Sequence, residues 1–265
     1  MAVCVVRVIK TLILFISLSL LLSGCGAPDV EISLPEYIMH AGGETPNGRR
    51  ESNSIEALNN SYENGEYWLE LDFSLTSDSK FVCVHDFYAY YSKDLTGVDV
   101  PDLEVFEKLR KSTYGFESPT LDSLILWLDT HPMAVIVTDV KENNLDFART
   151  VAENYPDYIK RFAIQIYGRD EYKTVTALGF DKVIYTLYKQ PAERYDVKLI
   201  RKFAKKSKNL IALTYAADVE NSDSIAEIAK IGVPVYIHTI NSAEEQSFWR
   251  EFGAYGFYTD CIQAK

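Results

Sequence analysis

The chain has 265 residues, of which 47% are hydrophobic and 25% charged, and its formal net charge is −11. Such an acidic balance argues against binding nucleic acid or another polyanion through bulk charge. The length that remains after an N-terminal leader, about 240 residues, suits one α/β barrel domain with a large core.

The N-terminal segment has the features of a bacterial lipoprotein signal peptide. Arg7 and Lys10 precede an apolar run over 12–22, which is short for a membrane span. The run ends in Leu22-Ser23-Gly24-Cys25, which resembles the lipobox, a motif whose cysteine is acylated and becomes the mature N-terminus. An uncleaved membrane anchor is the alternative.

Three segments follow from this interpretation. We expect residues 1–24 to be the signal peptide, residues 25–36 to be a tether that starts at the lipidated Cys25, and residues 37–265 to be the folded domain. An anchor with more than one acyl chain holds a protein stably on a bilayer. The sequence therefore predicts an extracytoplasmic, membrane-anchored lipoprotein.

The first predicted strand ends in a histidine followed by glycines. It covers Tyr37–His40, and Ala41-Gly42-Gly43 comes next. Glycines at a strand end let the backbone approach a ligand closely, and the carboxyl end of a barrel strand is where catalytic groups lie. The next predicted element is a helix over 53–64, in which Asn53 and Glu56 have capping-box spacing.

The most informative pattern is a strand, a turn and a returning strand. Period-2 alternation puts Glu70 and Asp72 on one face, and a buried acid pair is costly without a cation. The turn formers Thr76-Ser77-Asp78-Ser79 precede a second strand over Phe81–His85. Folding back about the middle of this turn places Glu70 opposite His85. A polar hairpin at a sheet edge explains any one of these residues, but explains all three together less well.

These residues resemble the signature of the glycerophosphodiester phosphodiesterases. That signature combines Glu-x-Asp, a Thr-x-Asp turn and a terminal His-Asp, here His85-Asp86. The resemblance implies a TIM barrel that uses a divalent metal and two catalytic histidines, which are His40 and His85 in this chain.

The loop after the first strand departs from the family pattern. The family has His-Arg-Gly where this chain has Ala41 after the histidine, and Ser52 stands at the place of an acid. The missing arginine is the family's phosphate-binding residue. Arg49 or Arg50, in the same loop, is the candidate replacement; the alternative is a solvated basic pair.

A stretch rich in loop-forming and aromatic residues extends from position 87 to Pro119. So long a connection is typical of a lid or a substrate-selecting insertion, and we expect it to pack over the barrel mouth. Thr120 is expected to cap a helix. A buried parallel strand over Ala134–Asp139 follows.

That strand ends in an acid and a base on one face, Asp139 and Lys141. They resemble the family's Glu-x-Lys, which implies that Asp139 completes the metal site and that Lys141 faces the phosphate. A local ion pair is the structural alternative.

Strands and helices alternate over the rest of the chain. Strands are predicted at 161–167, 182–186, 210–215, 233–240 and 255–258, and helices near 170–178, 193–206, 222–230 and 242–251. With the returning strand excluded, this pattern predicts a (β/α)8 TIM barrel with a hairpin and a loop insertion after the second strand. Gln165 and His238, at strand ends, are candidate substrate-binding residues. His238-Thr239-Ile240-Asn241 and Thr259-Asp260 resemble the family's Trp-Thr-Val-Asn and closing Thr-Asp.

Together these residues can support phosphodiester hydrolysis. The reaction needs charge neutralisation on the phosphoryl oxygens, a base and an acid. The three carboxylates suit Ca²⁺ or Mg²⁺, and the two histidines titrate near neutrality. We expect a small-molecule substrate, either a glycerophosphodiester or a related lipid-headgroup or polyol phosphodiester, and no nucleic acid.

Two other functions fit part of the pattern. A barrel glycosidase that uses two carboxylates explains Glu70 and Asp139, but it leaves the histidines and Lys141 without a role. A lipoprotein that binds phosphodiesters without cleaving them accounts for the departures in the first loop.

Overall fold

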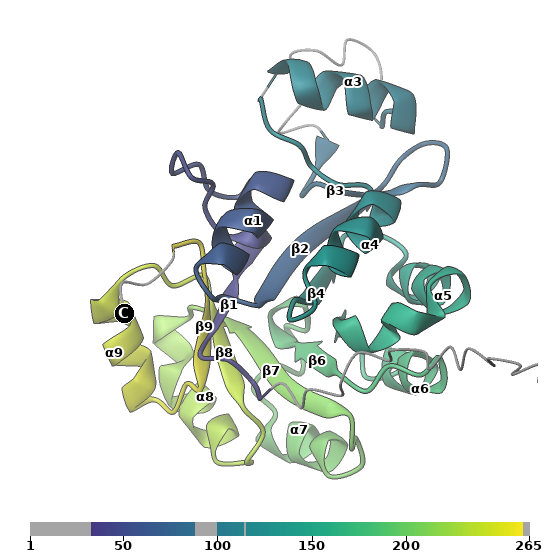
Figure 1. The fold of residues 1–265 in the computed structure, drawn as a ribbon. Helices are drawn as coiled ribbons and strands as arrows, with labels where there is room; N and C mark the ends of the chain where they lie inside the picture. The colour runs from purple at the N-terminus through teal and green to yellow at the C-terminus, as the bar shows by residue number, and fades with distance from the viewer. Residues whose placement is uncertain (1–32, 88–99, 114, 262–265) are drawn as a thin grey trace, which may run out of the picture. The chain divides into compact units, whose positions relative to one another are not determined.

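The computed structural model describes residues 33–87, 100–113 and 115–261 (Figure 1). Residues 1–24 and Cys25 lie outside the described residues. None of the helices in the described part of the chain has the length and hydropathy needed to span a membrane.

Eight parallel strands form a closed barrel, because β1 pairs with both β2 and β9. The predicted TIM barrel is therefore confirmed. In order around the barrel, the strands are β1 (Tyr37–Met39), β2 (Trp68–Leu75), β4 (Val135–Val140), β5 (Phe162–Ile166), β6 (Val183–Thr186), β7 (Leu210–Ala216), β8 (Val235–His238) and β9 (Gly256–Thr259).

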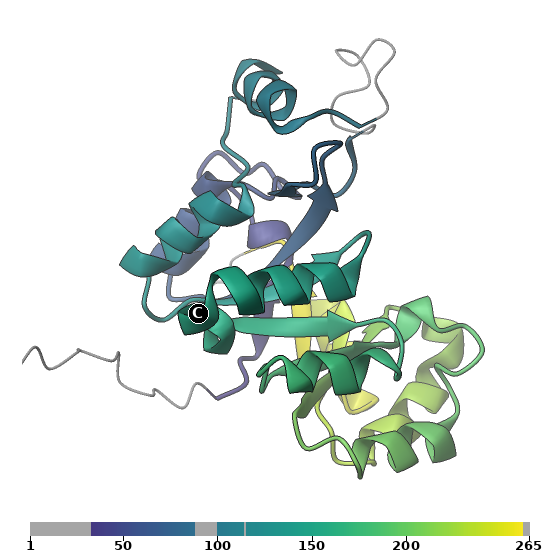
Figure 2. The same ribbon diagram turned by 90° about the vertical axis from the view of Figure 1, so that its right-hand side faces the viewer.

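Helices follow most of the strands and pack outside them, as Figures 1 and 2 show. They are α1 (Ile55–Glu63), α4 (Leu121–Thr130), α5 (Asn144–Asn154), α6 (Glu171–Ala177), α7 (Val197–Ala204), α8 (Ser222–Ala229) and α9 (Ala243–Glu251). Short 3-10 turns are η1 (His40–Gly42), η2 (Pro156–Arg161), η3 (Leu187–Lys189) and η4 (Val219–Asn221). The predicted cap of α4 is confirmed, since Thr120 accepts a hydrogen bond from the Ser123 N–H. Helix α5 was not predicted from the sequence.

The alternation predicted for β2 is present. Leu69, Leu71 and Phe73 lie in the hydrophobic core shared with the surrounding helices. Glu70 and Asp72 point the other way and are also buried. Helices cover the outer face of the sheet, so both faces of this strand are closed to water and the two acids stand inside the barrel.

The hairpin register differs from the prediction. β3 is Phe81–Cys83, and it pairs Phe73 with Cys83 and Leu75 with Phe81. The turn is therefore centred on Asp78, half a residue later than expected, because Ser79 adopts a left-handed conformation (φ 63°) and lengthens the loop. Pairing ends at Cys83, so Glu70 does not face His85; its partner on the neighbouring strand is Val137 of β4.

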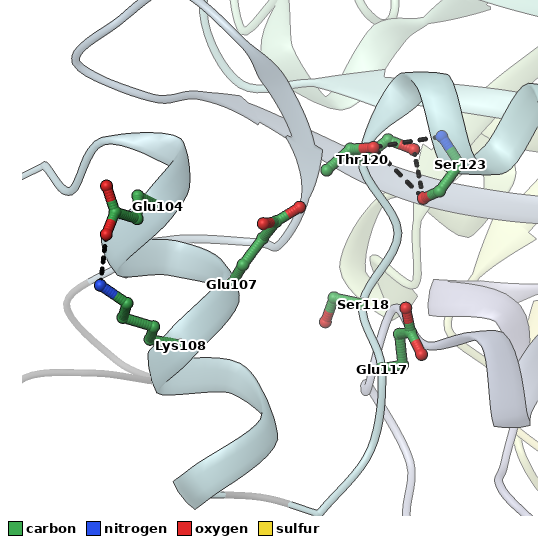
Figure 3. A pocket seen from close by; sticks show the side chains of 7 residues that line it. All are labelled: Glu104, Glu107, Lys108, Glu117, Ser118, Thr120 and Ser123. Carbon is green, nitrogen blue, oxygen red and sulfur yellow. Dashed lines mark hydrogen bonds and ion pairs between the residues drawn. The ribbon is translucent and has the colours of Figure 1, made fainter.

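The long connection after the hairpin contains a helix that the sequence analysis did not predict, α3 (Leu103–Thr113). A cavity of about 390 Å³ lies between α3 and the segment that leads into α4 (Figure 3). It is lined by Glu104, Glu107, Lys108, Glu117, Ser118, Thr120 and Ser123. None of the acids inside the barrel lines this cavity.

The chain enters the barrel at its amino end. The Tyr236 hydroxyl donates to the Pro35 carbonyl (2.6 Å) and the Tyr255 hydroxyl to the Leu34 carbonyl (3.0 Å). The last residues of the predicted tether are thus held against the starts of β8 and β9.

Candidate active site

Three buried carboxylates meet at the carboxyl end of the barrel. The register of β2 against β4 places Asp72 beside Asp139, and Glu70 stands two residues before Asp72 on the same face. The three residues are 2%, 3% and 7% exposed for Glu70, Asp72 and Asp139, and one oxygen of each lies within 4.8 Å of the others. The structure therefore brings together the three acids that the sequence singled out.

The Glu70 carboxylate is held by the backbone of the first loop. The Ala41 N–H donates to Glu70 Oε2 (2.8 Å), and Ala41 adopts a left-handed conformation (φ 48°) in the turn after β1. Burial, and then the negative charge of Asp72, raise the pKa of Glu70 to about 8. This site therefore favours a positive charge beside Glu70.

Asn53 clamps the second acid. Its side-chain amide donates to Asp72 Oδ2 (2.9 Å), and its carbonyl oxygen accepts from the Asp72 N–H (2.9 Å). Asn53 was predicted to cap the helix, but Ser54 is the cap and accepts a hydrogen bond from the Ala57 N–H. Two adjacent capping residues were the available signal, since only one of them can occupy the cap.

Lys141 bridges the second and third acids. Its ammonium lies 2.8 Å from Asp139 Oδ2 and also contacts Asp72 Oδ1. Burial opposes the charge on Asp139, but Lys141 and then Lys189 outweigh it and lower the pKa of Asp139. The predicted ion pair between Asp139 and Lys141 is present, and it forms inside the acid cluster.

Further donors surround Asp139. The Tyr167 hydroxyl donates to Oδ1, the Tyr188 hydroxyl lies 3.4 Å from Oδ2, and the Lys189 ammonium lies 3.5 Å from Oδ1. Tyr188 and Lys189 come from η3, after β6. No local sequence signal points to them, because their approach to Asp139 depends on the closure of the barrel.

His40 is oriented by an aspartate from the other end of the chain. Its Nδ1 lies 2.7 Å from Asp260 Oδ1, and the Asn241 amide donates to Asp260 Oδ2 (2.7 Å). Burial lowers the pKa of His40, but the hydrogen bond to Asp260 and the charges of Glu70 and Asp72 outweigh it and raise the pKa to about 9.

The second predicted catalytic histidine lies in a different setting. The His85 side chain is 57% exposed, and its Nδ1 is 3.2 Å from Asp86 Oδ2. Among the described residues the grouped metal-ligating side chains are Glu70, Asp72 and Asp139, without His85. The catalytic role of His85 stays a prediction.

The four predicted substrate-binding residues differ in their surroundings. Lys141 is in the acid cluster, whereas Gln165 is buried and accepts from the Thr186 hydroxyl (2.7 Å). Arg49 is exposed in the loop before α1. The His238 ring lies 4.4 Å from the Tyr188 ring, and within the described part of the chain its buried Nε2 lacks a hydrogen-bond partner.

His238 is a neutral imidazole. Burial, and then the nearby charge of His40, lower its pKa to about 4. It therefore presents a polar ring without charge beside the charged cluster.

A sequence profile of the glycerophosphoryl diester phosphodiesterase family matches residues 41–264. The chain belongs to this family. It is accordingly an enzyme, a hydrolase of the glycerophosphodiester phosphodiesterase type. No curated protein sequence matches the chain significantly.

Solved structures of the family share the barrel. A glycerophosphodiester phosphodiesterase from Parabacteroides distasonis is 20% identical, with a TM-score of 0.65 over 85% of this chain and 92% of that one. A putative member from Galdieria sulphuraria is 13% identical (TM-score 0.66; 87% and 95%). A phosphodiesterase from Oleispira antarctica, solved with its product sn-glycerol-3-phosphate, is 17% identical (TM-score 0.63; 86% and 93%). At these identities the likeness shows the fold.

The three carboxylates of this phosphodiesterase fit a divalent metal. Their oxygens converge within 4.8 Å, and oxygen ligands are those that hard cations such as Ca²⁺ and Mg²⁺ prefer. Burial, and then the negative charge of Asp72, raise the pKa of Glu70, so a cation beside Glu70 would stabilise its ionised form. The donor set could therefore hold a divalent cation.

Proposed function

We propose that this protein is a metal-dependent phosphodiesterase that hydrolyses a glycerophosphodiester or a related lipid-headgroup or polyol phosphodiester, with His40 and His85 as its acid and base. The observation that carries this proposal is the convergence of Glu70, Asp72 and Asp139 at the barrel mouth. A bound divalent cation, Ca²⁺ or Mg²⁺, would neutralise charge on the phosphoryl oxygens.

The residues around the cluster supply the remaining chemistry. Asp260 holds His40 through Nδ1, which leaves Nε2 as the nitrogen that exchanges a proton with the substrate. Lys141 stabilises the negative charge that develops on the phosphoryl group. His85 acts on the other side of the phosphorus, where its exposure gives it access to water or to a substrate hydroxyl.

Three further residues bind the substrate in this proposal. Arg49 supplies positive charge from the first loop, in place of the arginine that Ala41 replaces. Gln165 and His238 face the alcohol portion, and the buried Nε2 of His238 would gain the hydrogen bond that it lacks within the described residues.

The test is hydrolysis of a chromogenic phosphodiester and of glycerophosphocholine with and without EDTA. We expect turnover to require added Ca²⁺ or Mg²⁺, and H40A, H85A and D72N each to lower kcat by at least about 100-fold. Metal-independent turnover, or full activity of H85A, would contradict the mechanism.

A second function is favoured by one pair of observations. Ala41 replaces the arginine of the family motif, and His85 is largely exposed. These features fit a protein that binds phosphodiesters without cleaving them. Such a protein would bind the cation and sn-glycerol-3-phosphate but show no hydrolysis in the same assay.

We also propose that Cys25 is lipidated and anchors the enzyme outside the cytoplasm. The lipobox-like Leu22-Ser23-Gly24-Cys25 supports this proposal. The C25S variant should move from the membrane fraction to the soluble fraction when the protein is expressed in bacteria. Equal membrane association of C25S would contradict lipidation.

A further inference from the structure

Lys189 is the second ammonium group of the site, and it is more accessible than the first. It is the last residue of η3, which follows β6. Its side chain is 35% exposed, whereas that of Lys141 is 18% exposed. Its Nζ lies 3.5 Å from Asp139 Oδ1 and 4.4 Å from the centre of the Tyr167 ring. Lys189 thus reaches both the acid cluster and solvent.

The Asp139 carboxylate already has as many donors as it can accept. Tyr167 and Lys189 contact Oδ1, while Lys141 and Tyr188 contact Oδ2. An ionised carboxylate offers about four acceptor positions. A cation that binds Asp139 must therefore displace at least one donor.

Lys189 is the donor that a bound cation would displace from Asp139 most readily. Its contact is the longest of the four, at 3.5 Å, and Lys141 is held by a second acid, Asp72. Lys189 has the same charge sign as an incoming metal ion, so the two repel each other across Asp139. Tyr188, at 3.4 Å, is neutral and is not repelled in this way.

The charges of the site indicate what a displaced Lys189 would meet. When all three carboxylates are ionised, they exceed the two ammonium groups by one negative charge, and His40 is balanced by Asp260. A divalent cation changes this balance to one positive charge. A phosphodiester anion, which carries one negative charge, restores neutrality.

We propose that Lys189 is an anion-binding residue that rests on Asp139 in the unliganded protein and turns to the phosphoryl group when a divalent cation takes its place. Cation and anion binding are then coupled, and the cation binds first. This inference rests on the proposed metal site and substrate class, and it assigns the role of phosphate-binding cation to η3 as well as to the first loop.

Isothermal titration calorimetry of the K189Q variant tests the proposal without any turnover. Ca²⁺ is titrated first, and sn-glycerol-3-phosphate is then titrated at saturating Ca²⁺. Loss of the competing ammonium should tighten Ca²⁺ binding about two- to fivefold. Loss of the charge-assisted hydrogen bond should weaken sn-glycerol-3-phosphate binding about tenfold.

The proposal predicts tighter Ca²⁺ binding and weaker sn-glycerol-3-phosphate binding in K189Q. A purely structural role of Lys189 would instead weaken the binding of both ligands. K202Q, which removes an exposed lysine of α7, is the matched control and should leave both affinities within about twofold. K189M provides a second neutral variant should K189Q fold poorly, and K189R should restore sn-glycerol-3-phosphate binding. Unchanged affinities in both neutral variants, or a parallel loss of both ligands, would overturn the proposal.

The hydrolysis assay separates this inference from the proposed function. If K189Q binds Ca²⁺ more tightly and sn-glycerol-3-phosphate more weakly while the wild-type protein shows no hydrolysis, Lys189 binds anions as proposed, and the protein binds phosphodiesters without cleaving them. Wild-type hydrolysis with unchanged affinities in K189Q would preserve the enzyme and reject this role of Lys189.

Discussion

Replacing Asp260 by Asn tests how the site controls the charge of His40. The variant keeps the shape of the side chain but removes its negative charge. The hydrogen bond to Asp260 is the largest of the influences that raise the pKa of His40 from 6.5 to about 9, while burial acts in the opposite direction. We therefore expect the pKa to fall by at least about one unit in D260N, which corresponds to about 1.4 kcal/mol.

The same change alters how stability depends on pH. The pKa of His40 is higher in the folded protein than in the unfolded chain, so its stabilising contribution is complete below pH 6.5. The contribution is lost as the pH rises through about 9. Its full size is at most about 3 kcal/mol. The free energy of unfolding should thus fall more steeply over this window in the wild type than in D260N.

Two measurements check this prediction in the presence of EDTA, which keeps the acid cluster free of metal. The ring protons of the four histidines are titrated by NMR, with H40Q used for assignment. Urea unfolding is then compared between wild type and D260N at several pH values. The His40 charge also lowers the pKa of Glu70, so the ring titration of His40 carries the comparison and the unfolding data support it. A wild-type His40 midpoint below 7, or equal midpoints in the two proteins, would show that Asp260 does not raise the pKa of His40.

Three further substitutions probe the barrel. Asn53→Ala removes the hydrogen bond to the Asp72 carboxylate and the one from the Asp72 backbone N–H, and it should lower the free energy of urea unfolding by about 2 kcal/mol; an unchanged midpoint contradicts the clamp. Gly256→Ala places a Cβ 2.5 Å from the Glu36 carbonyl oxygen and should lower the free energy of thermal unfolding by about 1 to 3 kcal/mol. A wild-type Tm would show that the backbone at Glu36 and at Gly256 can move apart without cost. Phe147→Ala empties a fully buried site and should cost about 3 to 5 kcal/mol by urea unfolding, whereas the exposed control Leu126→Ala should change stability by less than about 0.5 kcal/mol.

Two local rules and the family resemblance together predicted the acid cluster, since the resemblance assigned Asp139 to the metal site. Alternation along β2 put Glu70 and Asp72 on one face, and a buried parallel strand brought Asp139 to the same end of the barrel. Neither inference depends on the backbone torsion angles of a turn. The strands around them were also predicted, with ends that differ by a few residues.

The missed features depend on single torsion angles or on distant parts of the chain. The register of the hairpin follows from the left-handed conformation of Ser79, which the residue type does not dictate. The clamp by Asn53 follows from its own left-handed conformation (φ 49°). Asp260 reaches His40 across 220 residues of sequence, and Lys189 reaches Asp139 across 50. No local sequence pattern predicts contacts between residues so far apart in the chain.

The chain enters the barrel at the end opposite its acid cluster. Leu34 and Pro35 are held at the amino ends of β8 and β9, whereas Asp72 and Asp139 lie toward the carboxyl ends of β2 and β4. If Cys25 is lipidated, as we propose, the tether joins the folded domain at the end of the barrel that lies away from the acid cluster.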